Sequence, residues 1–162
     1  MVIVVMGVSG SGKTTIGQAL AAAIGGEFRD GDDYHPPENI AKMASGVPLT
    51  DDDRAPWLAA LRRLIDERRT APGVLVLACS ALTRRIRQRL GLDRDGIRVV
   101  HLEGSETLLA ERMRARRHRH FMPPELLPSQ LELLERPENA LIVDASQPVD
   151  RLVAEIRSAF SI

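Results

Sequence analysis

An apolar run followed directly by a glycine-rich loop constrains the fold of this chain more than any other feature. Residues 1–6 read MVIVVM and residues 7–14 read GVSGSGKT, which fits the pattern G-x-x-x-x-G-K-[ST]. This pattern is typical of the turn between a buried strand and a helix, where backbone N–H groups and the positive end of the helix dipole surround a phosphate. The segment predicts a P-loop fold that binds ATP or GTP with magnesium.

The residue types of this loop suit a phosphate site. Glycines permit tight turns and a close approach of the backbone to an anion. Lys13 is expected to reach the β- and γ-phosphates, and the hydroxyl of Thr14 is expected to bind Mg²⁺. A glycine-rich turn that binds nothing is the alternative interpretation. The residues expected to hold the nucleotide in this segment are Gly7, Ser9, Gly10, Ser11, Gly12, Lys13, Thr14 and Thr15.

The order of apolar and amphipathic segments predicts one α/β domain, residues 1–162. Thr50, with Asp53 three residues later, predicts a capping box at the start of one helix. Strands apolar on both faces, in alternation with helices, predict a three-layer fold with a five-stranded parallel sheet and helices on both faces. The predicted strands are residues 2–6, 27–30, 74–79, 98–102 and 140–144. The predicted helices are residues 13–23, 36–45, 51–69, 83–90, 105–116, 124–134 and 149–160.

Composition limits the classes of partner. The chain has 22 basic and 22 acidic residues and a formal net charge of zero, so neither nucleic acid nor an anionic membrane is expected as a partner. Residues 1–6 lack the basic segment of a signal peptide, and no apolar run is long enough to span a bilayer. The single cysteine, Cys79, is expected to be a buried thiol. We predict a cytoplasmic protein.

Acidic residues follow the second predicted strand, where Asp30, Gly31 and Asp32 precede His35. In open α/β sheets, ligands bind beyond the carboxyl ends of the strands. A hydroxyl group that attacks a phosphate loses its proton, and a carboxylate can orient or accept that proton. We expect Asp32 to have this catalytic role, with Asp30 supporting it or contacting magnesium through water. A surface Asp-Gly turn is the alternative.

Arginines form a second group of candidates. Arg112 and Arg116 are four residues apart in a predicted helix, so both can face the nucleotide and stabilise charge on a transferring phosphoryl group. A solvated helix face and a nucleic-acid patch are the alternatives for this cluster. Arg54 suits a carboxylate or a phosphate, because its planar guanidinium forms two parallel hydrogen bonds. Trp57, the only tryptophan, is either a core residue or a stacking platform.

Together these segments resemble the gluconokinase family of small P-loop kinases. The resemblance covers nearly the whole chain, and it is most specific in residues 39–57, which read NIAKMASGVPLTDDDRAPW. It also includes the P-loop, DGD at residues 30–32, His35-Pro36, ACSAL at residues 78–82 and SQLELLERP at residues 129–137. The third predicted strand ends without the acidic residue that holds magnesium in many P-loop enzymes, which leaves Thr14, water and Asp32 for the metal.

The resemblance implies a nucleoside-monophosphate-kinase-like fold, a homodimer, a substrate-binding insertion at about residues 35–70 and a lid at about residues 116–124. It implies ATP-dependent phosphorylation of D-gluconate at the 6-hydroxyl, with Mg²⁺ as cofactor. Lys13, Asp32 and Arg116 are the catalytic residues under this hypothesis. The residues expected to bind gluconate are Asp32, His35, Lys42, Arg54, Ser80 and Gln130.

The nucleotide site is also extended by the resemblance. Arg112 and Arg116 are expected to contact the nucleotide from the lid side, and Gln147 and Pro148 to border the adenine, although a simple strand-to-helix turn fits the last two equally well. Other small-molecule kinases with this fold, for shikimate, adenylylsulfate or nucleotides, are the alternative functions. A nucleotide-dependent switch ATPase and a nucleic-acid-binding ATPase are alternatives from other classes.

Overall fold

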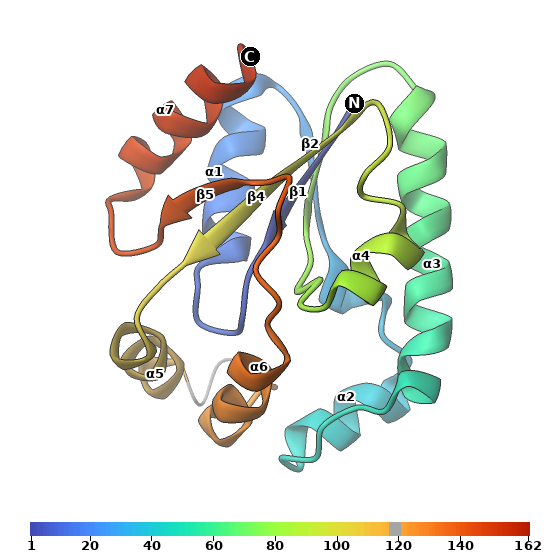
Figure 1. The fold of residues 1–162 in the computed structure, drawn as a ribbon, viewed down its shortest axis with the longest axis vertical. Coiled ribbons are helices and arrows are strands. Elements are labelled where there is room, and N and C mark those ends of the chain that lie inside the picture. The colour runs from blue at the N-terminus through green and yellow to red at the C-terminus, as the bar shows by residue number, and fades with distance from the viewer. Residues whose placement is uncertain (117–120) are drawn as a thin grey trace.

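The computed structural model describes residues 1–116 and 121–162, and its centre is a five-stranded parallel sheet (Figure 1). The strand order is β2-β3-β1-β4-β5, and every neighbouring pair is parallel. This confirms the predicted fold class. In the order of the sheet, the strands are β2 (Glu27–Asp30), β3 (Leu75–Ala78), β1 (Val2–Met6), β4 (Ile97–Glu103) and β5 (Leu141–Asp144).

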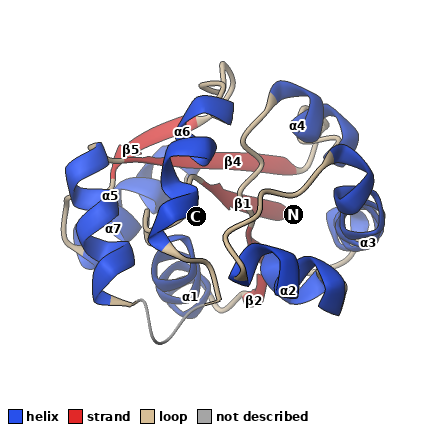
Figure 2. Cartoon of the chain, turned by 90° about the horizontal axis from the view of Figure 1, so that it is seen from below, coloured by secondary structure: helices blue, strands red, loops and turns tan. Residues whose placement is uncertain are grey.

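Helices cover both faces of the sheet. Helices α1 (Lys13–Ile24) and α7 (Val149–Phe160) lie against one face, and α3 (Asp51–Thr70) and α4 (Arg84–Leu90) lie against the other (Figure 1). Three further helices lie at the carboxyl ends of the strands and face the viewer in Figure 2. They are α2 (Pro37–Ala44), α5 (Glu106–Ala115) and α6 (Leu127–Leu133).

Strand β1 explains why the sheet needs two layers of helices. All five of its residues are fully buried. Val2, Val4 and Met6 pack with the apolar residues of α3 and α4, whereas Ile3 and Val5 pack with those of α1 and α7. Successive side chains of a strand point to opposite faces, so a strand that is apolar at every position is stable only between two apolar layers.

A third apolar cluster covers the carboxyl edge of the sheet. It joins the P-loop to α2, α5 and α6, and so fixes these helices around the space where a ligand would lie. Its buried members are Val8, Met43, Leu49, Leu82, Leu109, Met113, Met122, Leu126 and Leu127. The predicted insertion, residues 35–70, corresponds to α2 and α3. The predicted lid includes residues 117–120, which lie outside the described residues.

Two short 3-10 helices were not predicted. Gly31–Tyr34 follows β2, and Asp30 caps it by accepting a hydrogen bond from the backbone N–H of Asp32. Pro124–Leu126 replaces the start of the predicted helix 124–134, because Pro128 has no N–H to bond the carbonyl of residue 124. In the part of the chain that the structure describes, no helix has the length and apolar character needed to cross a membrane.

Candidate active site

The glycine-rich segment connects β1 to α1, as predicted. Gly10 and Gly12 adopt φ angles of 83° and 96°, in a region that residues with a side chain rarely enter. A Cβ atom on Gly10 would lie 2.8 Å from the carbonyl oxygen of Leu109, so the loop can follow this path only with glycine there. Gly12 is the N-cap of α1 and has no side-chain capping bond, which leaves the first N–H groups of that helix free for an anion.

Thr14 and Asp30 place oxygen atoms beside this loop. The Thr14 hydroxyl donates a 2.7 Å hydrogen bond to Oδ2 of Asp30. The other oxygen of Asp30, Oδ1, accepts a 3.1 Å bond from the backbone N–H of Asp32. Hydroxyl and carboxylate oxygens suit Mg²⁺, which usually binds one or two protein groups and otherwise keeps water and substrate phosphates. No cluster of three or more His, Cys, Asp or Glu residues for a metal occurs within residues 1–116 and 121–162.

Lys13 and Asp32 lie together next to the phosphate loop. The Lys13 ammonium donates a 3.1 Å hydrogen bond to the carbonyl oxygen of Val8. Burial lowers the pKa of Lys13, and the neighbouring Asp32 carboxylate opposes that shift. Burial raises the pKa of Asp32 to about 6, while the positive charges of Lys13 and Arg116 work in the other direction. A carboxyl group with a pKa near neutrality is suited to take a proton from a hydroxyl group.

Two cavities meet at these residues. The smaller is the phosphate cavity, lined by the P-loop, Asp32 and Arg116. The larger, which we call the acceptor cavity, lies between α2, α3, α6 and the segment after β3. Ser9, Lys13 and Asp32 line both cavities. A ligand in the acceptor cavity would therefore approach a bound phosphate beside the Asp32 carboxylate.

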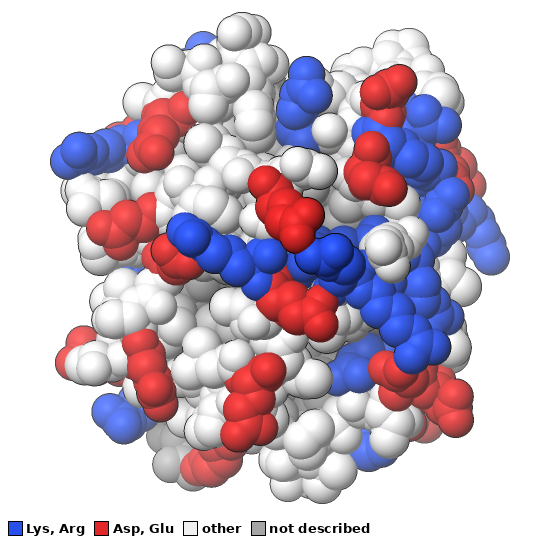
Figure 3. Space-filling view, viewed as in Figure 1, with Lys and Arg blue, Asp and Glu red and all other residues white. Residues whose placement is uncertain are grey.

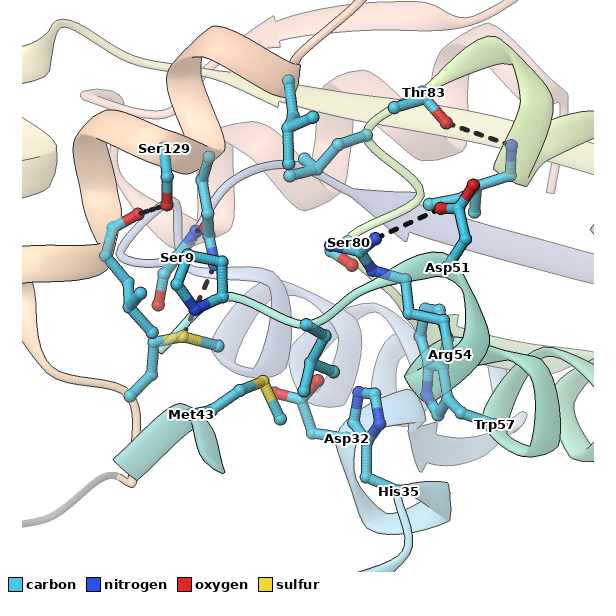
Figure 4. A pocket seen from close by; sticks show the side chains of 18 of the residues that line it. Ser9, Asp32, His35, Met43, Asp51, Arg54, Trp57, Ser80, Thr83 and Ser129 are labelled. Carbon is cyan, nitrogen blue, oxygen red and sulfur yellow. Dashed lines mark hydrogen bonds and ion pairs between the residues drawn. The ribbon is translucent and has the colours of Figure 1, made fainter. Parts of the chain in front are cut away.

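The acceptor cavity brings together five of the six predicted gluconate residues. Figure 4 shows Asp32, His35, Arg54 and Ser80 around one space, with Ser9 and Ser129 across from them. Gln130 completes the set, because its Oε1 accepts a 2.6 Å hydrogen bond from the backbone N–H of Ser9. The five predicted residues come from four separate segments of the chain, and the fold brings them together.

Lys42, the sixth predicted gluconate residue, does not line the acceptor cavity. Its Nζ lies 2.5 Å from Oδ2 of Asp53. Asp53 and Thr50 form the predicted capping box at the start of α3, and the hydrogen bond from Lys42 is the main reason that the pKa of Asp53 falls to about 2. Lys42 therefore ties α2 to the start of α3.

Trp57 is a core residue that also packs against a neighbouring ring. It is buried, and its indole ring stacks on the imidazole of His35 with a centroid distance of 4.6 Å and an interplanar angle of 7°. The indole N–H donates a 2.7 Å hydrogen bond to the carbonyl oxygen of Gly31. One ring thus connects the wall of the acceptor cavity to the residue before Asp32.

Helix α5 brings arginines to the P-loop. The guanidinium of Arg116 donates a hydrogen bond to Oγ of Ser9, and burial lowers the pKa of Arg116. Arg112 donates to the carbonyl oxygens of Ser11 and Ala145, at 3.4 and 2.8 Å. A third cavity follows, lined by both arginines and Gln147. Pro148 does not line it and instead is the N-cap of α7.

Other basic residues lie on a mixed-charge surface. Figure 3 shows basic side chains interleaved with acidic ones across the face that carries α4 and the segment before β5. Arg62 and Arg94 both pair with Asp66, and Arg136 pairs with Glu103. Carboxylates thus offset much of the positive charge on this face.

Comparison with known proteins accords with this geometry. A family model described as an AAA domain matches residues 2–137. The chain is 48% identical over 153 residues to the gluconokinase of Gluconobacter oxydans, an alignment that covers 94% of this chain and 82% of that protein. It is 41% identical over 169 residues to a probable gluconokinase of Dictyostelium discoideum, with 96% and 84% covered. The chain belongs to the gluconokinase family.

A solved structure described as a gluconokinase from Sinorhizobium meliloti 1021 is similar throughout. Its TM-score is 0.84 at 48% sequence identity, and the match covers 98% of this chain and 90% of that one. The fold and the family predicted from the sequence are therefore confirmed.

Two charged residues of this gluconokinase-family site were not predicted. Asp51 lines the acceptor cavity and pairs with Arg54 at 3.5 Å and Arg85 at 3.0 Å. Arg87 donates to the carbonyl oxygens of Ala81 and Leu82, at 2.9 and 3.0 Å, and so holds the segment that carries Ser80. Nothing in the residue types separates these two from other surface charges, since their roles depend on contacts between α3, α4 and the segment after β3.

Proposed function

We propose that this gluconokinase-family chain transfers the γ-phosphoryl group of ATP to the 6-hydroxyl of D-gluconate. The position of Asp32 is the main support, because it lines both the phosphate cavity and the acceptor cavity. The relatives named gluconokinase supply the identity of the acceptor. The products are ADP and 6-phosphogluconate.

Under this proposal the P-loop and Lys13 hold the triphosphate. The gluconate 6-hydroxyl oxygen forms a bond to the γ-phosphorus, and the bond from that phosphorus to the β–γ bridging oxygen breaks. The proton of the hydroxyl moves to the Asp32 carboxylate. Arg116, which contacts Ser9 of the loop, stabilises the charge on the transferring group.

Thr14 and Asp30 are the protein groups that we propose for Mg²⁺, Thr14 directly and Asp30 through water. The hydrogen bond between them places both oxygens next to the P-loop, where a cation would also meet phosphate oxygens. Magnesium supplies charge neutralisation for the triphosphate when it is bound. Removal of magnesium with a chelator should abolish phosphoryl transfer.

Arg54 is the residue that we propose for the gluconate carboxylate. Its guanidinium reaches the acceptor cavity from α3, whereas Lys42, the other cation considered, is bound to Asp53. Hydrogen bonds from His35, Ser80 and Gln130 to the hydroxyl groups of the sugar acid would complete the site. Gln147 would border the adenine in the third cavity.

The decisive experiment is incubation with Mg·ATP and a panel of acceptors, with mass spectrometry of the products. The panel contains D-gluconate, related sugar acids, shikimate, adenylylsulfate and nucleoside monophosphates. We expect rapid formation of 6-phosphogluconate. Phosphorylation of only a nucleotide or shikimate would overturn the choice of acceptor, and ATP hydrolysis that depends on a protein partner, without any phosphorylated acceptor, would indicate a switch ATPase.

We further propose a homodimer that acts in the cytoplasm, as the family resemblance implies. Sedimentation equilibrium tests the first part, with an expected mass about twice the 17.8 kDa of one chain. Cell fractionation with an antibody tests the second. A mass of one chain at working concentrations would contradict the dimer and leave the catalytic proposal intact.

A further inference from the structure

Asn39 is a buried polar residue behind the acceptor cavity. Its side chain belongs to α2, and only 5% of the residue is exposed. Nδ2 donates a 2.7 Å hydrogen bond to the carbonyl oxygen of Asp53 and lies 3.3 Å from Nδ1 of His35. One amide group therefore faces both the start of α3 and the imidazole ring.

The carbonyl oxygen of Asp53 fixes the orientation of this amide. A carbonyl can only accept a hydrogen bond, so the Asn39 atom beside it must be the NH₂ group, since the reversed amide would place two acceptors against each other. The same NH₂ group faces His35 and can only donate to Nδ1. A neutral imidazole that accepts at Nδ1 carries its proton on Nε2.

The surroundings of His35 keep the ring neutral and in place. Burial and the nearby Arg54 lower its pKa to about 4, so the neutral form predominates near pH 7. Stacking on Trp57 fixes the plane of the ring, and Trp57 is itself bonded to Gly31. Figure 4 shows the imidazole directed into the acceptor cavity beside the Asp32 carboxylate.

We propose that Asn39 is a positioning residue that holds His35 as the Nε2–H tautomer, so that His35 donates a hydrogen bond to a hydroxyl oxygen of the acceptor. Asp32, when ionised, only accepts hydrogen bonds. A polyhydroxylated acceptor has hydroxyl groups that both donate and accept, and the Asp32–His35 pair offers one partner of each kind. The hydrogen bond that His35 donates to the substrate rests on the proposed function. The tautomer does not, because the contacts that fix it exist in the free protein.

The first experiment measures the tautomer in the free protein by long-range ¹H–¹⁵N NMR of the histidine rings, with His35→Gln used to assign the signal. We expect the Nε2–H form in the unmodified chain. In Asn39→Asp the new carboxylate accepts from the ring, so we expect a shift to the Nδ1–H form. Asn139→Asp, an exposed site with the same change of charge, should leave the signal unchanged. An Nδ1–H ring in the unmodified chain, or no change in Asn39→Asp, would overturn the proposal.

The second experiment measures KM for gluconate and does not depend on the folding of Asn39 variants. The side-chain amide of glutamine can place its NH₂ near the position of Nε2, whereas that of asparagine reaches only the position of Nδ1. We expect His35→Asn to raise KM about tenfold, as for the loss of one hydrogen bond, and His35→Gln to raise it less, with kcat less affected in both. Equal KM values in the two variants would exclude His35 as a donor to the acceptor. A chain that phosphorylates no sugar acid would refute the proposed function, while the NMR result would still decide the tautomer.

Discussion

At the scale of single residues, the proposed chemistry depends on how the fold treats Asp32. Asp32 is half-buried where two cavities meet. The loss of solvation raises the pKa of its carboxyl group to about 6, and Lys13 and Arg116 only partly offset that rise. A carboxylate that is held at the edge of ionisation is a better proton acceptor than one with an ordinary pKa.

Asp32→Asn should therefore lower kcat by about 100- to 10,000-fold, since an amide cannot take the proton. Asparagine has nearly the same shape, so the far-UV circular dichroism spectrum should remain that of the original chain. Steady-state assays of ADP release with saturating gluconate measure the effect. A kcat within about threefold of the original would remove Asp32 from the mechanism.

The pH dependence of kcat/KM should also reflect Asp32. Its pKa lies near 6 in the folded chain, so the reactive carboxylate is lost as the pH falls through 6, and kcat/KM should fall about tenfold per pH unit below it. Because folding raises this pKa from 3.8, the group contributes stability below 3.8 that disappears as the pH rises through about 6. Acidification from pH 7 to 5 should thus reduce activity, and protonation of Asp32 should not unfold the chain.

Assays between pH 5 and 8, each with a thermal melt, test this expectation. A profile that stays flat down to pH 5 would contradict the raised pKa. If activity is lost together with the folded structure, a group other than Asp32 causes the decrease in kcat/KM at low pH.

At the scale of elements, the start of α3 connects packing with substrate binding. Its first turn carries Asp51 and Arg54 on the wall of the acceptor cavity. The capping box pairs the backbone N–H groups of Thr50 and Asp53 with each other's side chains. The Lys42–Asp53 pair joins this turn to α2. Loss of the cap should therefore affect both the stability of the fold and the position of Arg54.

Thr50→Ala should lower the free energy of unfolding by about 1 kcal/mol, the usual cost of a lost N-cap. It should also raise KM for gluconate a few-fold, and change KM for ATP little, because Arg54 faces only the acceptor. Ser105→Ala is the matched control, since the Ser105 hydroxyl caps α5 in the same way. Chemical denaturation and steady-state kinetics measure both effects, and equal changes of gluconate KM in the two variants would refute the link.

The elements themselves were largely predictable, whereas their side-chain partners were not. Every predicted strand, and every predicted helix except residues 124–134, agrees with the structure to within one residue at each end. Parallel strands that are buried on both faces leave uninterrupted apolar runs, and such runs are visible in a sequence. The ion pair of Lys42 depends on how α2 packs against α3, and periodicity contains no information about that contact.

At the scale of the whole molecule, the strand order divides the site into two halves around β1. The P-loop follows β1 in the middle of the sheet. On the side of β4 and β5, Ala145 and Gln147 line the third cavity, and on the side of β3 and β2, Ser80 and Asp32 line the acceptor cavity. The strand order reverses direction at β1, and the crevice at such a reversal is the usual ligand site of open α/β sheets.

Nucleotide binding should stabilise the whole fold, because it joins the P-loop to α5 and to the segment after β5. At about 100 times Kd, Mg·ADP should add about 2.7 kcal/mol, which corresponds to an increase of about 5–10 °C in Tm for a chain of this size. Lys13→Ala should lose most of that increase. Differential scanning calorimetry measures it, and an undiminished increase in Lys13→Ala would show that Lys13 does not hold the phosphates.

The position of Trp57 gives the chain an intrinsic optical probe. It is the only tryptophan, so all indole fluorescence comes from a ring that stacks on His35 and bonds to Gly31. Occupation of the adjacent space by a sugar acid should change the emission of this one fluorophore. A titration without nucleotide would then give the acceptor Kd directly, with no label attached to the protein.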